Sequence, residues 1–303
     1  MVRMTREESY VQAVQALPLR LRQEALSLSG EDRAEAEELR LRSGWPMTAL
    51  IRGRERPLGG APVEGAELEQ LVEIASRASL HTVLDQVRQG YLTFEGGHRI
   101  GLCGTAALKN GEIHALRTIS SANVRIARQV RGAAAAVLDG LCPGRRLADT
   151  LILAPPGLGK TTLLRDLIRA VSEGEGGVPL RVSLADERGE VAAMYGGRPQ
   201  LDVGRRTDVA EGCPKAQGLM ILLRAMNPQV LAVDEITAPE DVRALMMAAG
   251  CGVTLLATAH GEGRADLERR PLYRPLLEEG LFRFLVRICR EGERRIYTIE
   301  ELR

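Results

Sequence analysis

Aromatic residues are scarce in this 303-residue chain, which holds three Phe, five Tyr and one Trp. Proteins that bind single-stranded nucleic acids stack the bases on such side chains. A formal net charge of +1 also offers no broad attraction to a phosphate backbone. The composition therefore argues against a nucleic-acid partner, although arginine-rich loops leave a RecA-like nucleic-acid motor or recombinase open as an alternative.

Cysteines are few, and no long apolar run is present. The five cysteines are odd in number and form no C-x-x-C pair; they are Cys103, Cys142, Cys213, Cys251 and Cys289. This pattern argues against a disulfide framework or a zinc site and is typical of reduced cytoplasmic thiols. No apolar run approaches the roughly 18 residues that span a bilayer, and the first residues, MVRMTREESY, are too polar for a signal peptide. We expect a cytoplasmic protein that does not insert into a membrane and reaches one through partners.

Lysine is nearly absent as well, because only three of the 41 basic residues are lysines: Lys109, Lys160 and Lys215. Arginine supplies positive charge almost everywhere else. A retained lysine therefore indicates a position where a compact ammonium group is needed. Lys160 lies in a glycine-rich turn. The same reasoning singles out Lys215, although chance is a competing explanation for a single residue.

The turn around Lys160 has the sequence order of a phosphate-binding P-loop. In TLILAPPGLGKTT, an apolar strand leads into a glycine loop and then into a pattern of helical spacing. Glycines let backbone N–H groups face a phosphate, and Ala154 replaces the usual first glycine. Lys160 is expected to reach the β- and γ-phosphates of ATP, and the Thr161 hydroxyl to ligate Mg²⁺. The expected nucleotide-binding residues are Ala154, Pro155, Pro156, Gly157, Leu158, Gly159, Lys160, Thr161 and Thr162.

A second apolar strand, VLAV, ends in the carboxylates Asp234 and Glu235. Beside a P-loop, Asp234 is expected to hold Mg²⁺ through its hydration shell, and Glu235 to polarise a water for attack on the γ-phosphate. The alternative is an ordinary solvated strand end. A carboxylate that activates water also suits an ATPase better than a small-molecule kinase.

Two further strand ends carry polar groups. Asp186, Glu187 and Glu190 follow an apolar run, in the crevice where parallel sheets bind ligands. The alternative is the acid-rich start of a helix. His260 closes another strand, where it could sense the γ-phosphate, although a single histidine is a weak signal.

The chain reads as two domains. Residues 1–140 combine short helices with hairpins, which predicts a small α+β domain and linker; they include an alanine-rich helix at 132–141. Residues 141–303 alternate strands with helices and end in a hairpin, which predicts an α/β domain with a parallel sheet. The expected parallel strands are Thr150–Ala154, Leu180–Ala185, Val230–Val233 and Val253–Thr258. A long irregular region, Met194–Pro214, lies between the second and third strands, and such a loop is usually functional or mobile.

The motifs APPGLGKTT, LADERGE, LLRAMNPQVLAVDEI and TAHG together resemble the ATPases of type II and type IV secretion and of type IV pili. That resemblance implies a RecA-like P-loop core. It also implies an acidic box at Asp186, Glu187 and Glu190, an Arg-x-x-x-Pro element at Arg224 and Pro228, and a His box at His260. We expect no counterpart here of the extra C-terminal helical domain of the pilus ATPases.

A closer resemblance is to the stage III sporulation protein AA family of spore-forming bacteria. It rests on VSLADERGEVAA, RRTDVAEGCPKAQGLMILLRAMNPQVLAVDEI and NVRIARQVRG, and it is looser before residue 90. It implies an ATPase of the mother cell that forms a ring, expected to be a hexamer. This ring would energise a channel to the forespore and dock on membrane proteins of the stage III set.

A ring would also complete the nucleotide site, because an arginine from a neighbouring subunit can cover the γ-phosphate. The candidates are Arg125, Arg128, Arg205 and Arg206, each of which could instead be a surface or structural arginine. A nucleotide-gated scaffold that does not hydrolyse ATP is a further alternative.

Overall fold

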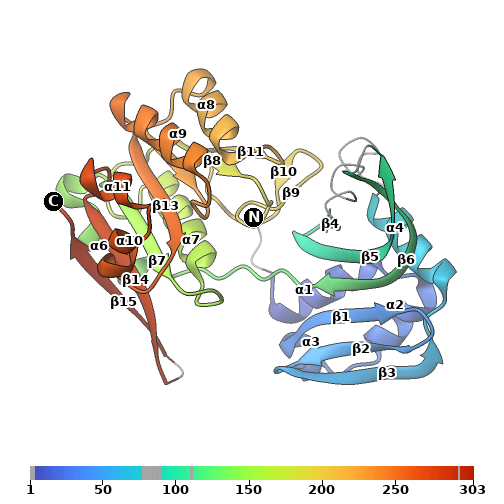
Figure 1. Cartoon of the computed structure of the whole chain (residues 1–303). Helices are drawn as coiled ribbons and strands as arrows, with labels where there is room; N and C mark the ends of the chain where they lie inside the picture. Colours follow the sequence, from blue (N-terminus) through green and yellow to red (C-terminus); the bar gives the residue numbers. More distant parts are fainter. Residues whose placement is uncertain (1–3, 77–86, 88–89, 110–111, 293) are drawn as a thin grey trace. The chain divides into compact units, whose positions relative to one another are not determined.

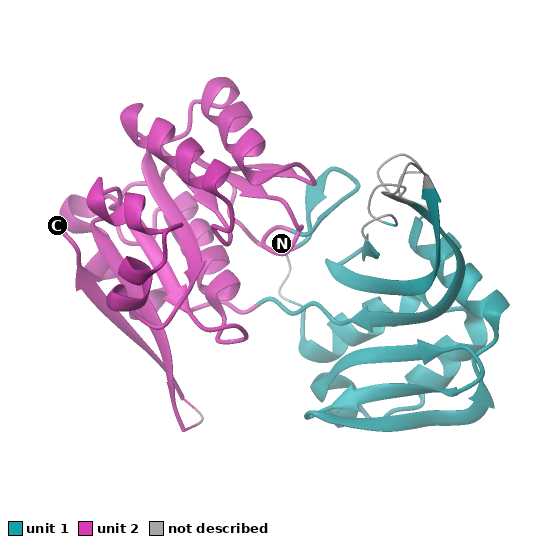
Figure 2. Cartoon of the chain, viewed as in Figure 1, with its two compact units in different colours: residues 1–129, 193–200 teal, residues 130–192, 201–303 magenta. Residues whose placement is uncertain are grey.

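The computed structural model describes residues 4–76, 87, 90–109, 112–292 and 294–303 (Figure 1). The chain divides into two compact units (Figure 2). The first comprises Met1–Gln129 with Ala193–Gln200, and the second Val130–Ala192 with Leu201–Arg303. The chain thus passes between the units after Gln129, and the boundary expected near residue 140 lies within the second unit.

The first unit is an antiparallel sheet covered by helices. Its strands follow the order β3-β2-β1-β6-β5-β4. Their bounds are β1 Ala36–Arg42, β2 Pro46–Ile51, β3 Arg54–Pro62, β4 Tyr91–Phe94, β5 His98–Lys109 and β6 Glu112–Arg125; the helices are α1 Arg6–Ala13, η1 Val14–Ala16, α2 Leu19–Leu26, α3 Gly30–Glu35 and α4 Gly65–Ser76. The apolar spacing of Leu68, Leu71, Val72 and Ala75, followed by Val83, Leu84 and Val87, predicts one or two amphipathic helices. The first set lies in α4, and most of the second set lies outside the described residues.

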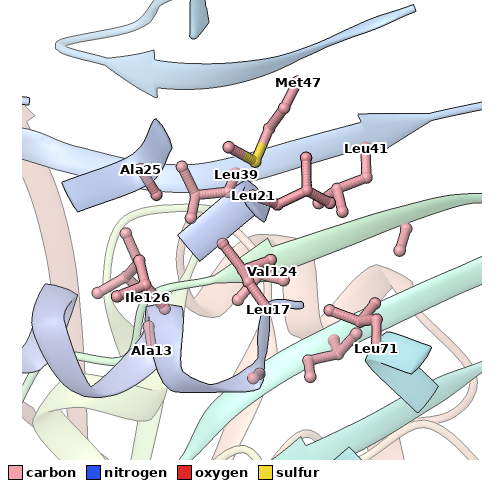
Figure 3. Close-up of a cluster of buried hydrophobic side chains, with 14 of the residues drawn as sticks. Ala13, Leu17, Leu21, Ala25, Leu39, Leu41, Met47, Leu71, Val124 and Ile126 are labelled. Atoms are coloured by element: carbon pink, nitrogen blue, oxygen red, sulfur yellow. The ribbon is translucent and has the colours of Figure 1, made fainter. Parts of the chain in front are cut away.

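The local signals of the first unit explain its elements. Thr5 and Glu8 cap α1 reciprocally, because each side chain bonds the other residue's backbone N–H. In β1 the alternation predicted from LRLR is present, with Leu39 and Leu41 buried and Arg40 and Arg42 partly exposed. Figure 3 shows these leucines meeting Leu17 and Leu21 of the helical layer in one apolar core.

The second unit is built on a seven-stranded sheet with the order β11-β8-β12-β13-β7-β14-β15. Its strands are β7 Thr150–Ala154, β8 Val182–Asp186, β11 Thr207–Glu211, β12 Val230–Val233, β13 Thr254–His260, β14 Phe284–Glu291 and β15 Arg294–Glu301. Six of these strands are parallel, and β15 pairs antiparallel with β14. The four predicted parallel strands and the closing hairpin are therefore confirmed.

The main helices of the second unit are α7 Lys160–Glu173, α8 Lys215–Ala225 and α9 Pro239–Gly250. Shorter helical turns are η2 Ala134–Ala136, α6 Leu138–Leu141, η3 Pro143–Arg145, α10 Arg264–Arg269 and α11 Arg274–Glu278. Helix α7 begins after Gly159 (φ 97°) and ends at Gly174 (φ 86°), two left-handed positions that suit glycine. Its buried residues include Leu163, Leu164 and Leu167, so it fastens the P-loop to the sheet.

Two sequence expectations beyond residue 130 were wrong. The alanine-rich segment is not one helix over 132–141, because it breaks at Val137 (φ −130°) into η2 and α6. The backbone N–H of Ala134 donates to Oδ2 of Asp166 at 2.8 Å, at the start of η2. The region 194–214 is also not uniformly irregular. It contains the short strands β9 Met194–Tyr195 and β10 Arg198–Pro199, and then β11, which pairs parallel with β8.

The fold gathers the predicted motifs in one place. Parallel strands β7, β13, β12 and β8 are neighbours, so their carboxyl ends meet at one edge of the sheet. Among the described residues, no helix is both long enough and apolar enough to cross a bilayer.

Candidate functional site

The loop between β7 and α7 has the backbone of a phosphate cradle. Gly157 (φ 79°) and Gly159 (φ 97°) both adopt left-handed conformations, and the loop ends at the N-terminus of α7, where N–H groups are free to bind an anion. Pro155, Pro156 and Leu158 complete the loop. Ala154 lies at the end of β7 without a left-handed backbone, so a methyl group is tolerated where related loops have glycine.

Lys160 is buried at the start of α7, with 7% of its surface exposed. Its Nζ lies 3.1 Å from the carbonyl oxygen of Ala154 and 3.4 Å from that of Pro155. It also lies 2.8 Å from Nδ1 of His260. Burial lowers the pKa of Lys160, and the nearby carboxylates of Glu235 and Asp234 oppose that effect.

Asp234 follows β12 and receives two hydroxyl hydrogen bonds. Thr161 Oγ1 donates to Oδ2 at 2.8 Å, and Thr258 Oγ1 donates to Oδ1 at 2.7 Å. Burial raises the pKa of Asp234, and these two hydrogen bonds counteract the rise. The two residues expected to hold Mg²⁺, Thr161 and Asp234, are therefore in direct contact.

Glu235 has a left-handed backbone (φ 57°), which is unusual for a residue with a side chain. Thr258 holds this conformation from both sides. Its Oγ1 accepts a hydrogen bond from the N–H of Glu235 at 2.8 Å, and its carbonyl oxygen accepts one from the N–H of Ile236 at 2.9 Å. Such strain persists where the surroundings fix the backbone, as they do at functional sites.

His260 links Lys160 to Glu235. An ammonium group can only donate, so Nδ1 of His260 is the acceptor for Lys160 and the ring proton belongs on Nε2. Nε2 in turn contacts Oε1 of Glu235, while Arg188 lies 3.6 Å from the other carboxylate oxygen. The P-loop and the end of β12 are thus joined through the histidine at the end of β13.

Asp186 is almost fully buried at the end of β8, with 2% of its surface exposed. Its carboxylate accepts hydrogen bonds from the backbone N–H groups of Glu190, Val191 and Ala192 at 2.8–3.0 Å. Burial nevertheless raises the pKa of Asp186 to about 6. This side chain therefore fixes the backbone of the loop that follows β8.

The other two acids of this segment also lie beside the end of β12. Glu187 pairs with Lys215 at 2.9 Å. The carbonyl oxygen of Glu190 accepts a hydrogen bond from Arg165 at 2.6 Å. One small pocket brings the acidic segment and the end of β12 together and is lined by Asp186, Glu187, Arg188, Glu190, Lys215, Asp234 and Glu235.

A family model described as "Sporulation stage III, protein AA" matches residues 6–301. The chain is also 42% identical over 250 residues to the stage III sporulation protein AA of Bacillus subtilis, covering 82% of this chain and 80% of that protein. The chain belongs to the stage III sporulation protein AA family.

A more distant relative of this family member is the uncharacterized protein ycf45 of Porphyra purpurea, 29% identical over 190 residues. That match covers 61% of this chain and 32% of the algal protein.

Two solved structures share the fold. The ATPase DotB of Legionella pneumophila aligns with a TM-score of 0.58 at 15% identity, and the alignment covers 99% of this chain and 81% of the DotB chain. The pilus retraction motor PilT, solved with ADP, aligns with a TM-score of 0.57 at 15% identity, and the alignment covers 87% of this chain and 78% of the PilT chain. These likenesses confirm a RecA-like P-loop core preceded by a smaller α+β domain.

Arg224 lies away from the P-loop of its own chain. It is exposed near the end of α8, and Pro228 precedes β12 at the amino end of that strand. Both residues line a groove of about 630 Å³ at this end of the sheet. The structure therefore does not bring Arg224 to the other predicted site residues of this family member.

The four arginines suggested as finger residues have different surroundings. Arg205 pairs with Glu173 at 2.7 Å, and Arg206 donates to the carbonyl oxygen of Ser172 at 3.0 Å. Arg128 donates to the carbonyl oxygen of Ala36 at 2.6 Å, while Arg125 is exposed at the end of β6.

Sequence reasoning missed three residues of the site. The first is Thr258, whose hydroxyl stands out in an otherwise apolar strand and could have suggested a partner for Asp234. Arg165 donates to the backbone of the loop after β8 at 2.6 Å, and nothing in its helix distinguishes it. Arg295 of β15 lies against the P-loop, since a Cβ at Gly159 would stand 3.4 Å from its Cζ; the sequence gives no hint of this proximity.

Proposed function

We propose that this chain is a ring-forming ATPase that hydrolyses MgATP to energise a secretion-like channel, or the assembly of that channel, between mother cell and forespore. The observation that supports it best is the hydrogen-bonded chain from Lys160 through His260 to Glu235, beside the contact between Thr161 and Asp234. A phosphate-binding lysine and a water-polarising carboxylate are thereby held in one network.

Binding of the triphosphate uses the loop and the start of α7. Backbone N–H groups from Gly157 to Thr162 face the phosphates, and the helix N-terminus favours negative charge. Lys160 exchanges its contacts with the loop carbonyl oxygens and His260 for the β- and γ-phosphates. That exchange releases Nδ1 of His260 close to the γ-phosphate.

The residues around Asp234 fit a magnesium ion. Among the described residues, no group of three His, Cys, Asp or Glu side chains could hold a metal ion by itself. Mg²⁺ needs no such group, because it is usually bound by one or two protein oxygens, phosphate oxygens and water. The hydroxyl of Thr161 and the carboxylate of Asp234 supply oxygens of this kind. The ion would neutralise charge on the β- and γ-phosphates.

Hydrolysis then requires a water in line with the bond to the leaving ADP. Glu235 orients this water and accepts its proton as the oxygen attacks the γ-phosphorus. The bond to the β-phosphate oxygen breaks, which yields ADP and inorganic phosphate. His260 donates to Glu235 from Nε2 and so holds the carboxylate in place.

The assembly part of the proposal concerns a hexameric ring. A single P-loop domain leaves the γ-phosphate accessible from one side, and an arginine of a neighbour can stabilise the transition state. Arg125, Arg128, Arg205 and Arg206 are the candidates, and Arg224 joins them because of its exposure. The membrane partners would belong to the stage III sporulation set, with the ring docked peripherally on their cytoplasmic side.

The decisive experiment measures ATP hydrolysis across a protein concentration series for the wild type and Glu235→Gln, with mass from light scattering in the same samples. Turnover per subunit should rise as subunits assemble and should fall by about 100-fold or more in the variant, which keeps the shape but not the basicity of the side chain. Wild type that binds ATP without turnover, even with its membrane partners present, would instead indicate a nucleotide-gated scaffold. Turnover that DNA stimulates in a strongly salt-dependent manner would indicate a nucleic-acid motor.

Each finger candidate is tested in the same assay. Replacing Arg125, Arg128, Arg205, Arg206 and Arg224 one at a time by Ala should lower the turnover of the assembled form for at least one of them. Unchanged turnover per subunit in every variant would contradict a finger from this group.

A further inference from the structure

Lys215 is a buried lysine that the proposed hydrolysis does not use. It is one of three lysines in the chain and the first residue of α8, with 6% of its surface exposed. A cation in the first turn of a helix meets the positive end of the helix dipole. Lys215 is therefore not placed there to stabilise α8, and its partners must explain it.

The ammonium group contacts three acceptors from three different elements. Its Nζ lies 2.9 Å from Oε2 of Glu187, just after β8, and 2.9 Å from Oγ1 of Thr237, in the segment after β12. It also lies 3.7 Å from Oδ2 of Asp241 in α9. The three N–H bonds of an ammonium group point tetrahedrally toward acceptors on different sides, whereas the N–H bonds of the bulkier guanidinium all lie in one plane. This geometry explains why an arginine-rich chain keeps a lysine at residue 215.

The segment held by Lys215 is the one that carries Glu235. Thr237 follows Glu235 by two residues. The backbone N–H groups of Thr237 and Ala238 both donate at 3.0 Å to Oδ2 of Asp241, the oxygen that also faces Lys215. On its other side the left-handed backbone of Glu235 is held by Thr258. Lys215 and Thr258 thus fix the two ends of the strained segment.

The positive charge of Lys215 also offsets the negative charge of the neighbouring pocket. The pocket beside it is lined by five carboxylates, of Asp186, Glu187, Glu190, Asp234 and Glu235, against the cations Lys215 and Arg188. Arg188 has a side chain that is 61% exposed, so much of its field is screened by water. Lys215 is the buried cation of this pocket and holds Glu187 away from the other acids.

We propose that Lys215 is a positioning residue for Glu235. It ties Thr237 to Glu187 and Asp241 and so holds the carboxylate where it can orient the attacking water. The inference rests on the proposed hydrolysis, and it assigns to Lys215 a role in turnover but not in nucleotide binding.

The test compares Lys215→Met with Arg243→Met, a control that removes an arginine from an exposed ion pair with Glu240 on α9. Lys215→Met should lower kcat by about 10-fold to 100-fold, the cost of a displacement of about 1 Å at a reacting group. Its affinity for an ATP analogue should stay within about threefold of wild type, because no P-loop contact is lost. Amide hydrogen exchange without nucleotide should quicken in the peptide containing residues 234–238. The control should change none of these quantities.

Three further variants keep the test independent of folding defects. Thr237→Val removes one hydroxyl and no charge, and it should reproduce the fall in kcat and the faster exchange, whereas Thr237→Ser should restore both. Lys215→Arg should not restore turnover, because the larger planar guanidinium does not fit the buried place of the ammonium group.

Opposite results overturn the assignment. Lys215→Met with wild-type kcat and wild-type exchange would show that residue 215 does not position Glu235. An equal loss of ATP affinity, Tm and kcat in Lys215→Met and Thr237→Val would show a purely structural role. If wild-type protein has no turnover, the proposed function fails, while the exchange measurement still decides whether Lys215 holds the segment.

Discussion

The ends of β8 and β12 carry two aspartates with different partners. The strands are neighbours in register, with Ala185 opposite Val233, so Asp186 and Asp234 lie next to each other at the same edge of the sheet. Asp186 accepts hydrogen bonds from three backbone N–H groups, whereas Asp234 accepts them from two side-chain hydroxyls. Backbone donors have no other partner when the carboxylate is removed, but hydroxyls can rotate toward water, metal or phosphate. We therefore infer different roles for the adjacent aspartates, with Asp186 shaping a loop and Asp234 available to a ligand.

The comparison predicts that Asp234→Ala affects chemistry far more than stability. Turnover should fall by about 100-fold to 1,000-fold, the cost of losing one strong electrostatic contact in an active site. The affinity for ADP should lose its dependence on Mg²⁺ concentration, which a fluorescent nucleotide reports without any turnover. Tm should stay near the wild-type value, because the hydroxyls of Thr161 and Thr258 can bond water. Retained Mg²⁺ dependence would show that Asp234 does not serve the metal.

Asp186→Ala should have the opposite profile. It leaves three buried or partly buried backbone donors without their acceptor, and each such loss costs about 1–3 kcal/mol before water enters. We expect the free energy of unfolding to fall by about 3 kcal/mol in all. The ATP affinity of the remaining folded fraction should change little. Chemical denaturation and nucleotide titration of the same preparation check both statements, and a stable variant with lost ATP binding would place Asp186 in the nucleotide site.

The contrast between these aspartates marks the limit of what the sequence could predict. The strand ends, the P-loop and the pair Asp234 and Glu235 follow from local patterns, because the carboxyl ends of neighbouring parallel strands must meet. The partners of each carboxylate do not follow, since they depend on which groups the chain brings from elsewhere. Thr258 contacts Asp234, and Lys215 contacts Glu187, from segments distant in the sequence. No sequence spacing predicts either contact.

The same reasoning explains the elements that the sequence missed. Strand β11 is only partly buried along its length, because it lies at the edge of the sheet. It therefore lacks the continuous apolar run that revealed β7 and β12. The alanine-rich segment at 132–141 has high helix propensity, yet its backbone leaves the regular helical conformation at Val137 (φ −130°), between η2 and α6. Propensity alone therefore predicts a longer helix than the chain forms.

The pH dependence of stability offers a further test at the end of β8. The pKa of Asp186 is raised from 3.8 to about 6 by burial, so between these values the folded protein holds a proton that the unfolded chain has lost. The stability contributed by this group is full below pH 3.8 and is lost as the pH rises through about 6. The loss amounts to at most about 3 kcal/mol. The free energy of unfolding of the wild type, minus that of Asp186→Asn, should therefore decrease between pH 4 and pH 6. A difference that stays constant or increases would contradict a raised pKa.

The smallest effect is expected at the opposite end of the same strands. Arg224 lines the groove at the amino ends of β12 and β13, while Lys160 and Asp234 belong to the carboxyl ends. An exposed arginine at that distance is screened by solvent, so Arg224→Ala should change ATP affinity by less than about twofold. Lys160→Ala is the matched comparison, because it removes a cation of the P-loop itself. Titration with a fluorescent ATP analogue below the concentration at which the protein assembles isolates the binding site of one chain. A tenfold loss of affinity in Arg224→Ala would mean that the two ends of the sheet are coupled within one subunit. Unchanged affinity below that concentration, together with reduced turnover above it, would make Arg224 a contributor to a neighbouring subunit's site.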